Sequence, residues 1–318
     1  MLKYFYIRKS LLPTVFGLSK EQYFYVLKLA KTTFPNQKIS QLQVLTLQKY
    51  SKIIKILKGE PMKLILTSCM DLYYKDEDGK RIAQNFGNKN GILDLIKKLT
   101  PKQENFVFVA SDEFNFDVTD IYANATFDSF KITYPFKNYF ILDSRTEEKT
   151  KEFIEKADLI FLCGGHVPTQ NQFFQKINLR EIIKNSHALI IGQSAGSMNS
   201  AEIVYSQPEL EGESINPLFK RHIKGLGLTN ISILPHFEER INDVLDGKNV
   251  LKEISIPDSM VRPFIAYSDG AYIFDNGTSQ CIYGKAYLFE NGNYHQISKD
   301  DSVTDITALT KEKFSSNS

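Results

Sequence analysis

The feature of this sequence that most constrains its fold is an apolar run at residues 188–191 that leads directly into a Gly-x-Ser-x-Gly motif at residues 192–196. The run has the length and composition of a buried strand. A serine at a sharp strand-to-helix turn adopts strained backbone angles, and a glycine on each side lets the neighbouring backbone pass without a Cβ clash. Such a turn lifts the hydroxyl above the edge of a sheet, where the next amide, that of Ala195, can stabilise an oxyanion. The motif predicts Ser194 as a nucleophile, and a tight turn without chemistry is the alternative.

From residue 62 to about residue 227 the sequence alternates short apolar runs with helical segments. The expected strands lie at 63–68, 106–111, 139–143, 158–163 and 188–192, and the expected helices lie at 91–99, within 112–130, at 146–156 and at 179–186. Strands joined by helices of this length form a parallel sheet with helices on both faces. Beyond residue 227 the sequence is rich in strands, and glycine-containing turns at 275–277 and 291–293 predict β-hairpins.

The chain divides into three regions by composition. Residues 1–60 carry eleven Lys/Arg and two Asp/Glu, a balance of +9, whereas the other 258 residues carry 28 and 35, a balance of −7. We expect a basic helical extension at 1–61, an α/β domain at 62–297 and a loose, polar C-terminal tail at 298–318. The extension is expected to pack its apolar stripe on the α/β domain or on a second subunit. A basic module that contacts nucleic acid or an acidic partner is the alternative.

The composition limits the partners and cofactors to be expected. Hydrophobic residues make up 42% of the chain and the net charge is +2, values that are ordinary for a globular protein and that do not favour nucleic-acid binding. No apolar run approaches the roughly 20 residues that cross a bilayer. The three cysteines are scattered without a CxxC pair, which argues against a disulfide framework or a zinc site. We expect a cytoplasmic protein with no membrane contact, no metal and no cofactor.

The base that activates Ser194 is expected to be His236. Functional groups of a wound α/β sheet gather where its strands end. His236 follows an apolar run at 231–234, and it is the only one of the five histidines that comes directly after an expected core strand downstream of the serine. A serine hydroxyl needs a base with a pKa near neutrality, and histidine is the usual choice.

A second oxyanion donor is expected from the glycine pair that follows the strand at 158–163. Glycines at a strand end leave backbone amides uncovered, so Gly165 can act beside Ala195. A tight loop without chemistry is the alternative for this pair. His166 comes next, in a loop that we expect to face Ser194.

The acid that orients the imidazole has two candidates in the sequence. Asp269 follows the expected strand at 264–267 and again lies at a strand end, so we prefer it. Glu209 lies in a loop shortly after the helix that follows Ser194, and it stays open as the alternative.

These motifs together resemble the peptidase E (aspartyl dipeptidase) and cyanophycinase family of serine peptidases. The resemblance covers about residues 62–290 and rests on five segments in order: 62–68, Gly164-Gly165-His166, 192–196, Leu234-Pro235-His236-Phe237, and Asp269-Gly270-Ala271. It implies a flavodoxin-like α/β fold related to class I glutamine amidotransferases. It also implies Ser194 as nucleophile, His236 as base, the amides of Gly165 and Ala195 as oxyanion hole, and an acid near either Glu209 or Asp269.

Two positions bear on the substrate. His166 stands where members of the family usually have asparagine, so it is a candidate substrate-binding residue that departs from the pattern. Arg240 resembles a substrate-contacting arginine of the cyanophycinase branch, and it can hold a carboxylate bidentately or form an ion pair on its helix. A second arginine of that branch is replaced here by Asn242, which disfavours cleavage of cyanophycin fragments.

The sequence therefore predicts a serine-type peptidase that cleaves small peptides through a Ser-His-acid triad and an acyl-enzyme. An esterase is one alternative, because the Gly-x-Ser-x-Gly motif is shared. A catalytically inactive member that serves binding or assembly is the other. A homodimer is compatible with the resemblance.

Overall fold

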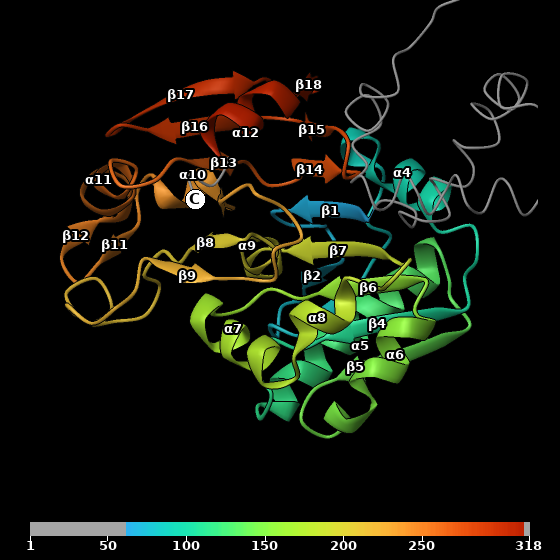
Figure 1. Ribbon diagram of the computed structural model, residues 1–318. Helices are drawn as coiled ribbons and strands as arrows, with labels where there is room; N and C mark the ends of the chain where they lie inside the picture. The colour runs from blue at the N-terminus through green and yellow to red at the C-terminus, as the bar shows by residue number, and fades with distance from the viewer. Residues whose placement is uncertain (1–61, 315–318) are drawn as a thin grey trace, which may run out of the picture. The chain divides into compact units, whose positions relative to one another are not determined.

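The computed structural model describes residues 62–314 (Figure 1), so the extension expected at 1–61 lies outside the described residues. An eight-stranded sheet forms the centre of the described part, in the order β18-β15-β14-β1-β7-β6-β4-β5. Five of its strands are parallel to one another: β1 (Lys63–Thr67), β7 (Leu189–Gln193), β6 (Leu159–Leu162), β4 (Asn105–Val109) and β5 (Asn138–Leu142). Three antiparallel strands extend one edge: β14 (Tyr272–Asp275), β15 (Gln280–Tyr283) and β18 (Val303–Asp305).

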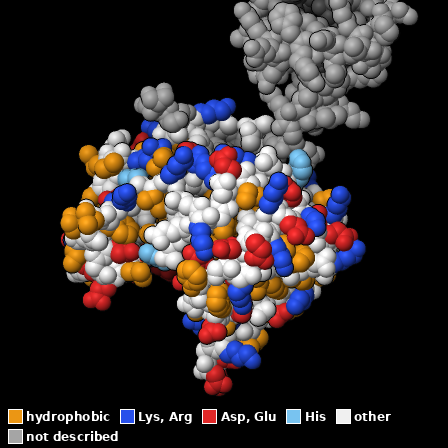
Figure 2. All heavy atoms as spheres, turned by 60° about the horizontal axis from the view of Figure 1, so that its bottom comes forward, with side chains coloured by type: hydrophobic (Ala, Val, Ile, Leu, Met, Phe, Trp, Pro, Cys, Tyr) orange, Lys and Arg blue, Asp and Glu red, His pale blue; other side chains and the backbone are white. Residues whose placement is uncertain are grey.

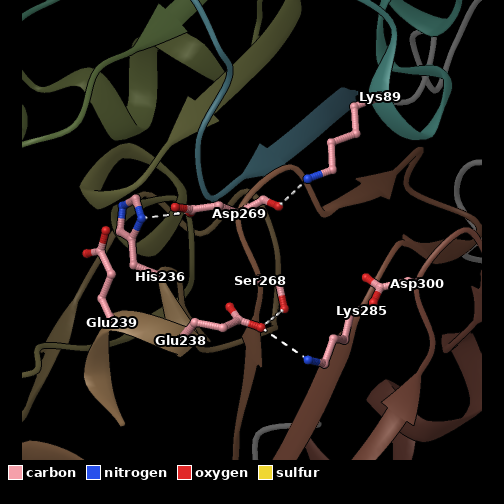
Figure 3. Close-up of a pocket in the computed structure, with 8 residues that line it drawn as sticks. All are labelled: Lys89, His236, Glu238, Glu239, Ser268, Asp269, Lys285 and Asp300. Atoms are coloured by element: carbon pink, nitrogen blue, oxygen red, sulfur yellow. Dashed lines mark hydrogen bonds and ion pairs between the residues drawn. The ribbon is translucent and has the colours of Figure 1, made fainter. Parts of the chain in front are cut away.

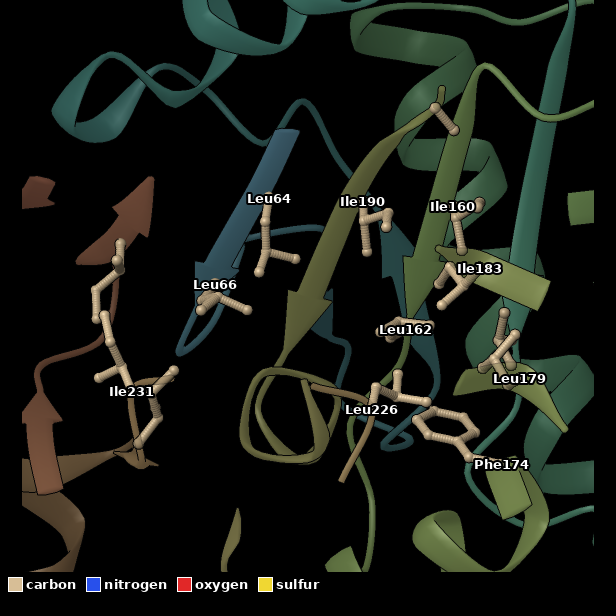
Figure 4. Packing of buried hydrophobic residues seen from close by; sticks show 14 of the residues in the cluster. Leu64, Leu66, Ile160, Leu162, Phe174, Leu179, Ile183, Ile190, Leu226 and Ile231 are labelled. Carbon is tan, nitrogen blue, oxygen red and sulfur yellow. The ribbon is translucent and has the colours of Figure 1, made fainter. Parts of the chain in front are cut away.

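Helices cover both faces of this sheet, as its continuous apolar strands require. The helices α4 (Ile92–Leu99) and α5 (Phe116–Thr133) pack on one face, in a cluster that includes Ile96 and Phe130. The other face carries α6 (Thr150–Lys156), α7 (Val167–Lys176) and α8 (Leu179–Ile183). Figure 4 shows the second cluster, in which Phe174 and Ile183 lie over the strand residues Leu162 and Ile190. Each such side chain contributes about 1.5–3 kcal/mol when it is fully buried. The architecture confirms the α/β flavodoxin-like fold.

A second sheet of four strands lies beside the first, at the upper left of Figure 1. Its order is β10 (Ile233–Leu234), β13 (Phe264–Tyr267), β16 (Ala286–Glu290) and β17 (Asn293–Ser298). The turn between β16 and β17 is Asn291-Gly292, and both residues have positive φ, 53° and 71°. Asn-Gly is the preferred pair for such a two-residue hairpin, because neither residue strongly resists the left-handed conformation. This hairpin, and the one between β14 and β15, confirm the expected C-terminal hairpins.

Short elements lie in the connections between these strands and helices. They are the pairs β2 (Tyr73–Lys75) with β3 (Arg81–Ala83), β8 (Ile203–Tyr205) with β9 (His222–Lys224), and β11 (Val244–Leu245) with β12 (Lys248–Asn249), together with the helices α9 (Ala195–Asn199), α10 (Phe237–Arg240) and α11 (Ile256–Asp258), a π-helical turn at Val250–Ser255, and 3₁₀ turns at Lys89–Gly91 and Glu147–Lys149. The helix α7 and the pairs β2–β3, β8–β9 and β11–β12 were not expected from the sequence.

The expectation of a loose tail at 298–318 is wrong for its described part. Residues 303–305 form β18 at the edge of the large sheet, and α12 (Thr307–Lys313) follows directly. Ile306, Thr310 and Phe314 are spaced four residues apart and are all buried. That spacing places them on one face of a helix, which packs on the core.

The surface of the described part carries charges of both signs. Figure 2 shows Lys and Arg side chains interspersed with Asp and Glu on the face that it presents. Within residues 62–314, no helix combines the length and the apolar character needed to cross a bilayer.

Candidate active site

Ser194 occupies a strained turn between β7 and α9. Its backbone angles are φ 51° and ψ −116°, which a serine adopts only when its surroundings enforce them. The surroundings include close backbone contacts at both flanking glycines. A Cβ on Gly196 would lie 2.1 Å from the carbonyl oxygen of Leu162, and one on Gly192 would lie 2.8 Å from the amide nitrogen of Ser197. The Gly-x-Ser-x-Gly spacing is therefore a packing requirement of this turn.

His236 reaches Ser194 from the second sheet. It follows β10 and precedes α10, and it has left-handed backbone angles of φ 57° and ψ 42°. Its Nε2 atom lies 3.0 Å from the Oγ of Ser194, which is hydrogen-bonding distance. The two side chains expected from the sequence to meet at one edge of the sheet are thus brought together.

Asp269 approaches the other nitrogen of the imidazole. It lies in the connection between β13 and β14, and its Oδ1 is 2.8 Å from Nδ1 of His236 (Figure 3). Burial by itself would raise the pKa of this carboxyl, but hydrogen bonds from His236 and Ser68 outweigh burial and leave the pKa below its ordinary value. Asp269 is accordingly a charged partner for the imidazole near neutral pH.

Glu209, the alternative acid, is engaged elsewhere. Its Oε1 is 3.2 Å from a guanidinium nitrogen of Arg240. Burial raises the pKa of Glu209, and the nearby Arg240 charge acts in the opposite direction. The structure therefore brings Asp269, and not Glu209, to Nδ1 of His236.

Ser68 is a site residue that the sequence reasoning did not single out. It is fully buried and follows the end of β1. Its hydroxyl accepts a hydrogen bond from the backbone amide of His236 at 2.9 Å and donates one to Oδ1 of Asp269. The sequence signal that points to it is only its place directly after a core strand.

The glycines after β6 lie against Ser194. A Cβ on Gly164 would be 3.2 Å from the Cβ of Ser194, a close approach that a side chain at this position would crowd. Gly165 has a φ of 148°, and a Cβ there would be 2.3 Å from the Oγ of Ser111. The amide of Ala195 begins α9 on the other side of the serine.

A pocket of about 290 Å³ opens beside His236 (Figure 3). Its lining is mostly charged: Lys89, His236, Glu238, Glu239, Ser268, Asp269, Lys285 and Asp300. Three potential metal ligands, on His236, Glu239 and Asp269, lie within 4.8 Å of one another. A metal ion bound there would compete for the imidazole and carboxylate that already hydrogen-bond to each other.

The two substrate-binding candidates are both paired with carboxylates. His166 lies 2.7 Å from the Oγ1 of Thr169 through Nδ1 and 2.8 Å from Glu213 through Nε2. Arg240 contacts Asp243 at 3.3 Å in addition to Glu209.

Comparison with known proteins identifies the family. A family model described as peptidase family S51 matches residues 82–279. Among solved structures, a peptidase from an acI-B1 Actinobacterium is 14% identical, with a TM-score of 0.53, over 77% of this chain and 97% of the other. A "Putative Peptidase E Protein" from Listeria monocytogenes EGD-e is 18% identical over 75% of this chain and 100% of the other, with a TM-score of 0.44. No curated protein matches this chain. At such low identity the first structure supports the fold alone. The family model, in contrast, spans more than half of the sequence. The chain therefore belongs to peptidase family S51 and is a serine-type peptidase.

Proposed function

We propose that the chain cleaves small peptides through a triad of Ser194, His236 and Asp269, with an acyl-enzyme intermediate. The observation that supports this proposal is a continuous line of hydrogen bonds, 3.0 Å from Ser194 Oγ to Nε2 of His236 and 2.8 Å from Nδ1 to Asp269.

The proposed reaction assigns Ser194, His236 and Asp269 distinct roles, and His236 acts in turn as base and as acid. The Oγ of Ser194 attacks the scissile carbonyl carbon while Nε2 of His236 takes the hydroxyl proton. Asp269 accepts the Nδ1 hydrogen bond and stabilises the imidazolium that forms. The amides of Gly165 and Ala195 stabilise the oxyanion. The imidazolium then gives its proton to the leaving amine as the C–N bond breaks. A water molecule, deprotonated by the same nitrogen, attacks the acyl carbon, and the imidazolium returns this proton to Ser194 Oγ as the ester bond breaks.

Labelling with a fluorophosphonate probe tests the nucleophile directly. We expect the full-length protein to be labelled, Ser194→Ala to show no labelling, and His236→Ala to be labelled at least about a hundredfold more slowly. A folded protein that stays unlabelled would instead favour the inactive binding or assembly role.

A substrate panel separates the peptidase from the esterase alternative. Dipeptides and simple aryl esters are offered to the same preparation, with Ser194→Ala as the blank. Cleavage of peptide bonds supports the proposal, whereas turnover confined to esters contradicts it.

A further inference from the structure

A group of charged residues borders the catalytic imidazole on the side of the loop that follows β8. Glu209 of this loop pairs with Arg240, which lies one helical turn after His236. The carboxylate of Glu209 is also close enough to His166, Glu213 and His236 for their charges to act on it. His166, which pairs with Glu213 of the same loop, directly follows Gly165, and a Cβ on the neighbouring Gly164 would lie 3.2 Å from the Cβ of Ser194. The pair formed by Glu209 and Arg240 therefore belongs to a group of side chains that borders both the loop beside Ser194 and the helix that begins at the imidazole.

This ion pair is poorly exposed. The side chains of Arg240 and Glu209 keep only 17% and 21% of their exposure. Solvent screens such a pair much less than a surface pair, so each partner has a strong effect on any third charge that enters. The second contact of Arg240, with Asp243, is more open, because the Asp243 side chain is 45% exposed.

The imidazole of His166 is also held by a carboxylate. Nε2 of His166 lies 2.8 Å from Oε1 of Glu213. The second oxygen of Glu213 accepts the backbone amides of Glu209 and Leu210, at 2.8 and 3.0 Å. Glu213 thus pairs with His166 and also holds the backbone of Glu209 in position beside Arg240.

The lysines of the adjoining pocket are engaged as well. Lys89 donates to the backbone oxygen of Asp269 at 3.0 Å, and Lys285 lies 3.3 Å from Glu238 (Figure 3). A substrate carboxylate that entered either side of the imidazole would have to displace a carboxylate or a carbonyl of the chain itself. It would also meet an excess of negative charge, because three carboxylates surround one guanidinium and one imidazole on the loop side.

We propose that Glu209 is a specificity-determining residue: it occupies the guanidinium of Arg240, so that the enzyme takes peptides whose acyl residue is uncharged and rejects those whose acyl residue is acidic. The inference rests on the proposed function, because it concerns the same acyl site. It assigns to Glu209 a role in substrate selection in place of the role of triad acid.

Two isosteric dipeptides, Asn-Leu and Asp-Leu, test the inference on the full-length protein. They differ only by an amide in place of a carboxylate, so the ratio of their kcat/KM values isolates the effect of the acyl charge. We expect the wild-type protein to favour Asn-Leu by about tenfold or more, and Glu209→Gln to raise the Asp-Leu to Asn-Leu ratio by about tenfold, because a neutral residue leaves Arg240 available.

Asp243→Asn is the matched control. It removes the other carboxylate partner of the Arg240 guanidinium. Because that carboxylate is more exposed, its removal should change the ratio of the kcat/KM values for Asp-Leu and Asn-Leu by less than about twofold. An equal gain of Asp-Leu cleavage in Asp243→Asn would assign the effect to overall charge and overturn the role of Glu209. If Glu209→Gln does not fold, the wild-type ratio still decides whether acidic acyl residues are rejected.

The fluorophosphonate probe distinguishes the two proposals. Absence of labelling at Ser194 in folded protein would overturn the proposed function, and the inference with it. Labelled protein that cleaves Asp-Leu at least as well as Asn-Leu, or that cleaves neither, would overturn the inference alone.

Discussion

A single buried hydroxyl connects two residues of the candidate triad, His236 and Asp269. Ser68 accepts the amide of His236 and donates to Asp269, so it fixes the backbone of the base and the carboxylate of the acid at once. Its exposed fraction is zero, and no competing water reaches it from bulk solvent. Mutation of a group that positions a catalytic side chain can lower activity about as much as mutation of a group that contacts the substrate.

Replacing Ser68 by alanine should lower kcat by about tenfold to a hundredfold with little change in KM. The hydrogen bond from Ser68 helps to lower the pKa of Asp269, so its loss raises that pKa. A carboxyl with a higher pKa becomes protonated at a higher pH. The pKa of the Asp269 carboxyl, followed by NMR titration, should therefore be higher in Ser68→Ala than in the wild-type protein.

Ser129→Ala is the control for that measurement, because Ser129 is another fully buried serine, and its hydroxyl donates to the backbone oxygen of Gln84, away from the triad. It should leave the pKa of Asp269 and the value of kcat unchanged. An unchanged pKa of Asp269 in Ser68→Ala, or a loss of activity that appears mainly in KM, would contradict the positioning role.

The identity of the acid can be tested by comparing two amides. Asp269→Asn should slow fluorophosphonate labelling by about 10³–10⁴-fold, because the amide favours the wrong imidazole tautomer. Glu209→Gln should leave labelling within a few-fold of the wild-type rate. The opposite order of the two rates would return the role of acid to Glu209.

At the scale of elements, the turn at Ser194 depends on how closely α9 lies against β6. A Cβ on Gly196 would be 2.1 Å from a backbone oxygen, and backbone cannot yield as a flexible side chain can. Gly196→Ala should lower the free energy of unfolding by at least about 2 kcal/mol, as measured by urea denaturation, and should abolish labelling of Ser194.

The comparison for that substitution is Gly79→Ala. Gly79 has a positive φ of 76° but open space around it. Its replacement should cost only the backbone strain, about 1 kcal/mol. Equal destabilisation by the two substitutions would argue against the close approach at Gly196.

Local patterns in the sequence predict some of these elements well and others not at all. The strands β1, β4, β6 and β7 are buried on both faces, so each reads as an apolar run. Ser194 and His236 were found because each directly follows such a run. Ser68 follows one too, but its partners are 168 and 201 residues away, and no local pattern encodes that contact.

The paired short strands and α12 were missed for a different reason. Strands such as β2 and β9 are only partly buried, so their sequences lack the apolar run that marks a core strand. In α12 about one residue in four faces the core, and the residues between these buried positions are mostly polar. Such a sequence is typical of a loose tail. Contacts with the rest of the protein determine the formation of these elements more than their own sequence does.

At the scale of the whole molecule, the C-terminal helix contributes to stability. Phe314 is buried in the same cluster as the strands of the central sheet. Phe314→Ala should lower the free energy of unfolding by about 3–5 kcal/mol. Glu312→Ala, at a position whose side chain is 72% exposed, should change it by less than about 0.5 kcal/mol.

Thermal or urea denaturation of the two variants checks this expectation. Equal stability of Phe314→Ala and the wild-type protein would show that α12 does not pack on the core in solution.

The three residues of the candidate triad are contributed by separate sheets. Ser194 ends a strand of the eight-stranded sheet, His236 ends a strand of the four-stranded sheet, and Asp269 lies where the chain crosses from one to the other. A sliding of one sheet past the other by little more than an ångström would separate oxygen from nitrogen while both sheets kept their own pairing. The hydrogen bond between Ser194 and His236 therefore depends on the relative position of the two sheets. We expect activity to be lost when this position changes, even if each sheet stays folded.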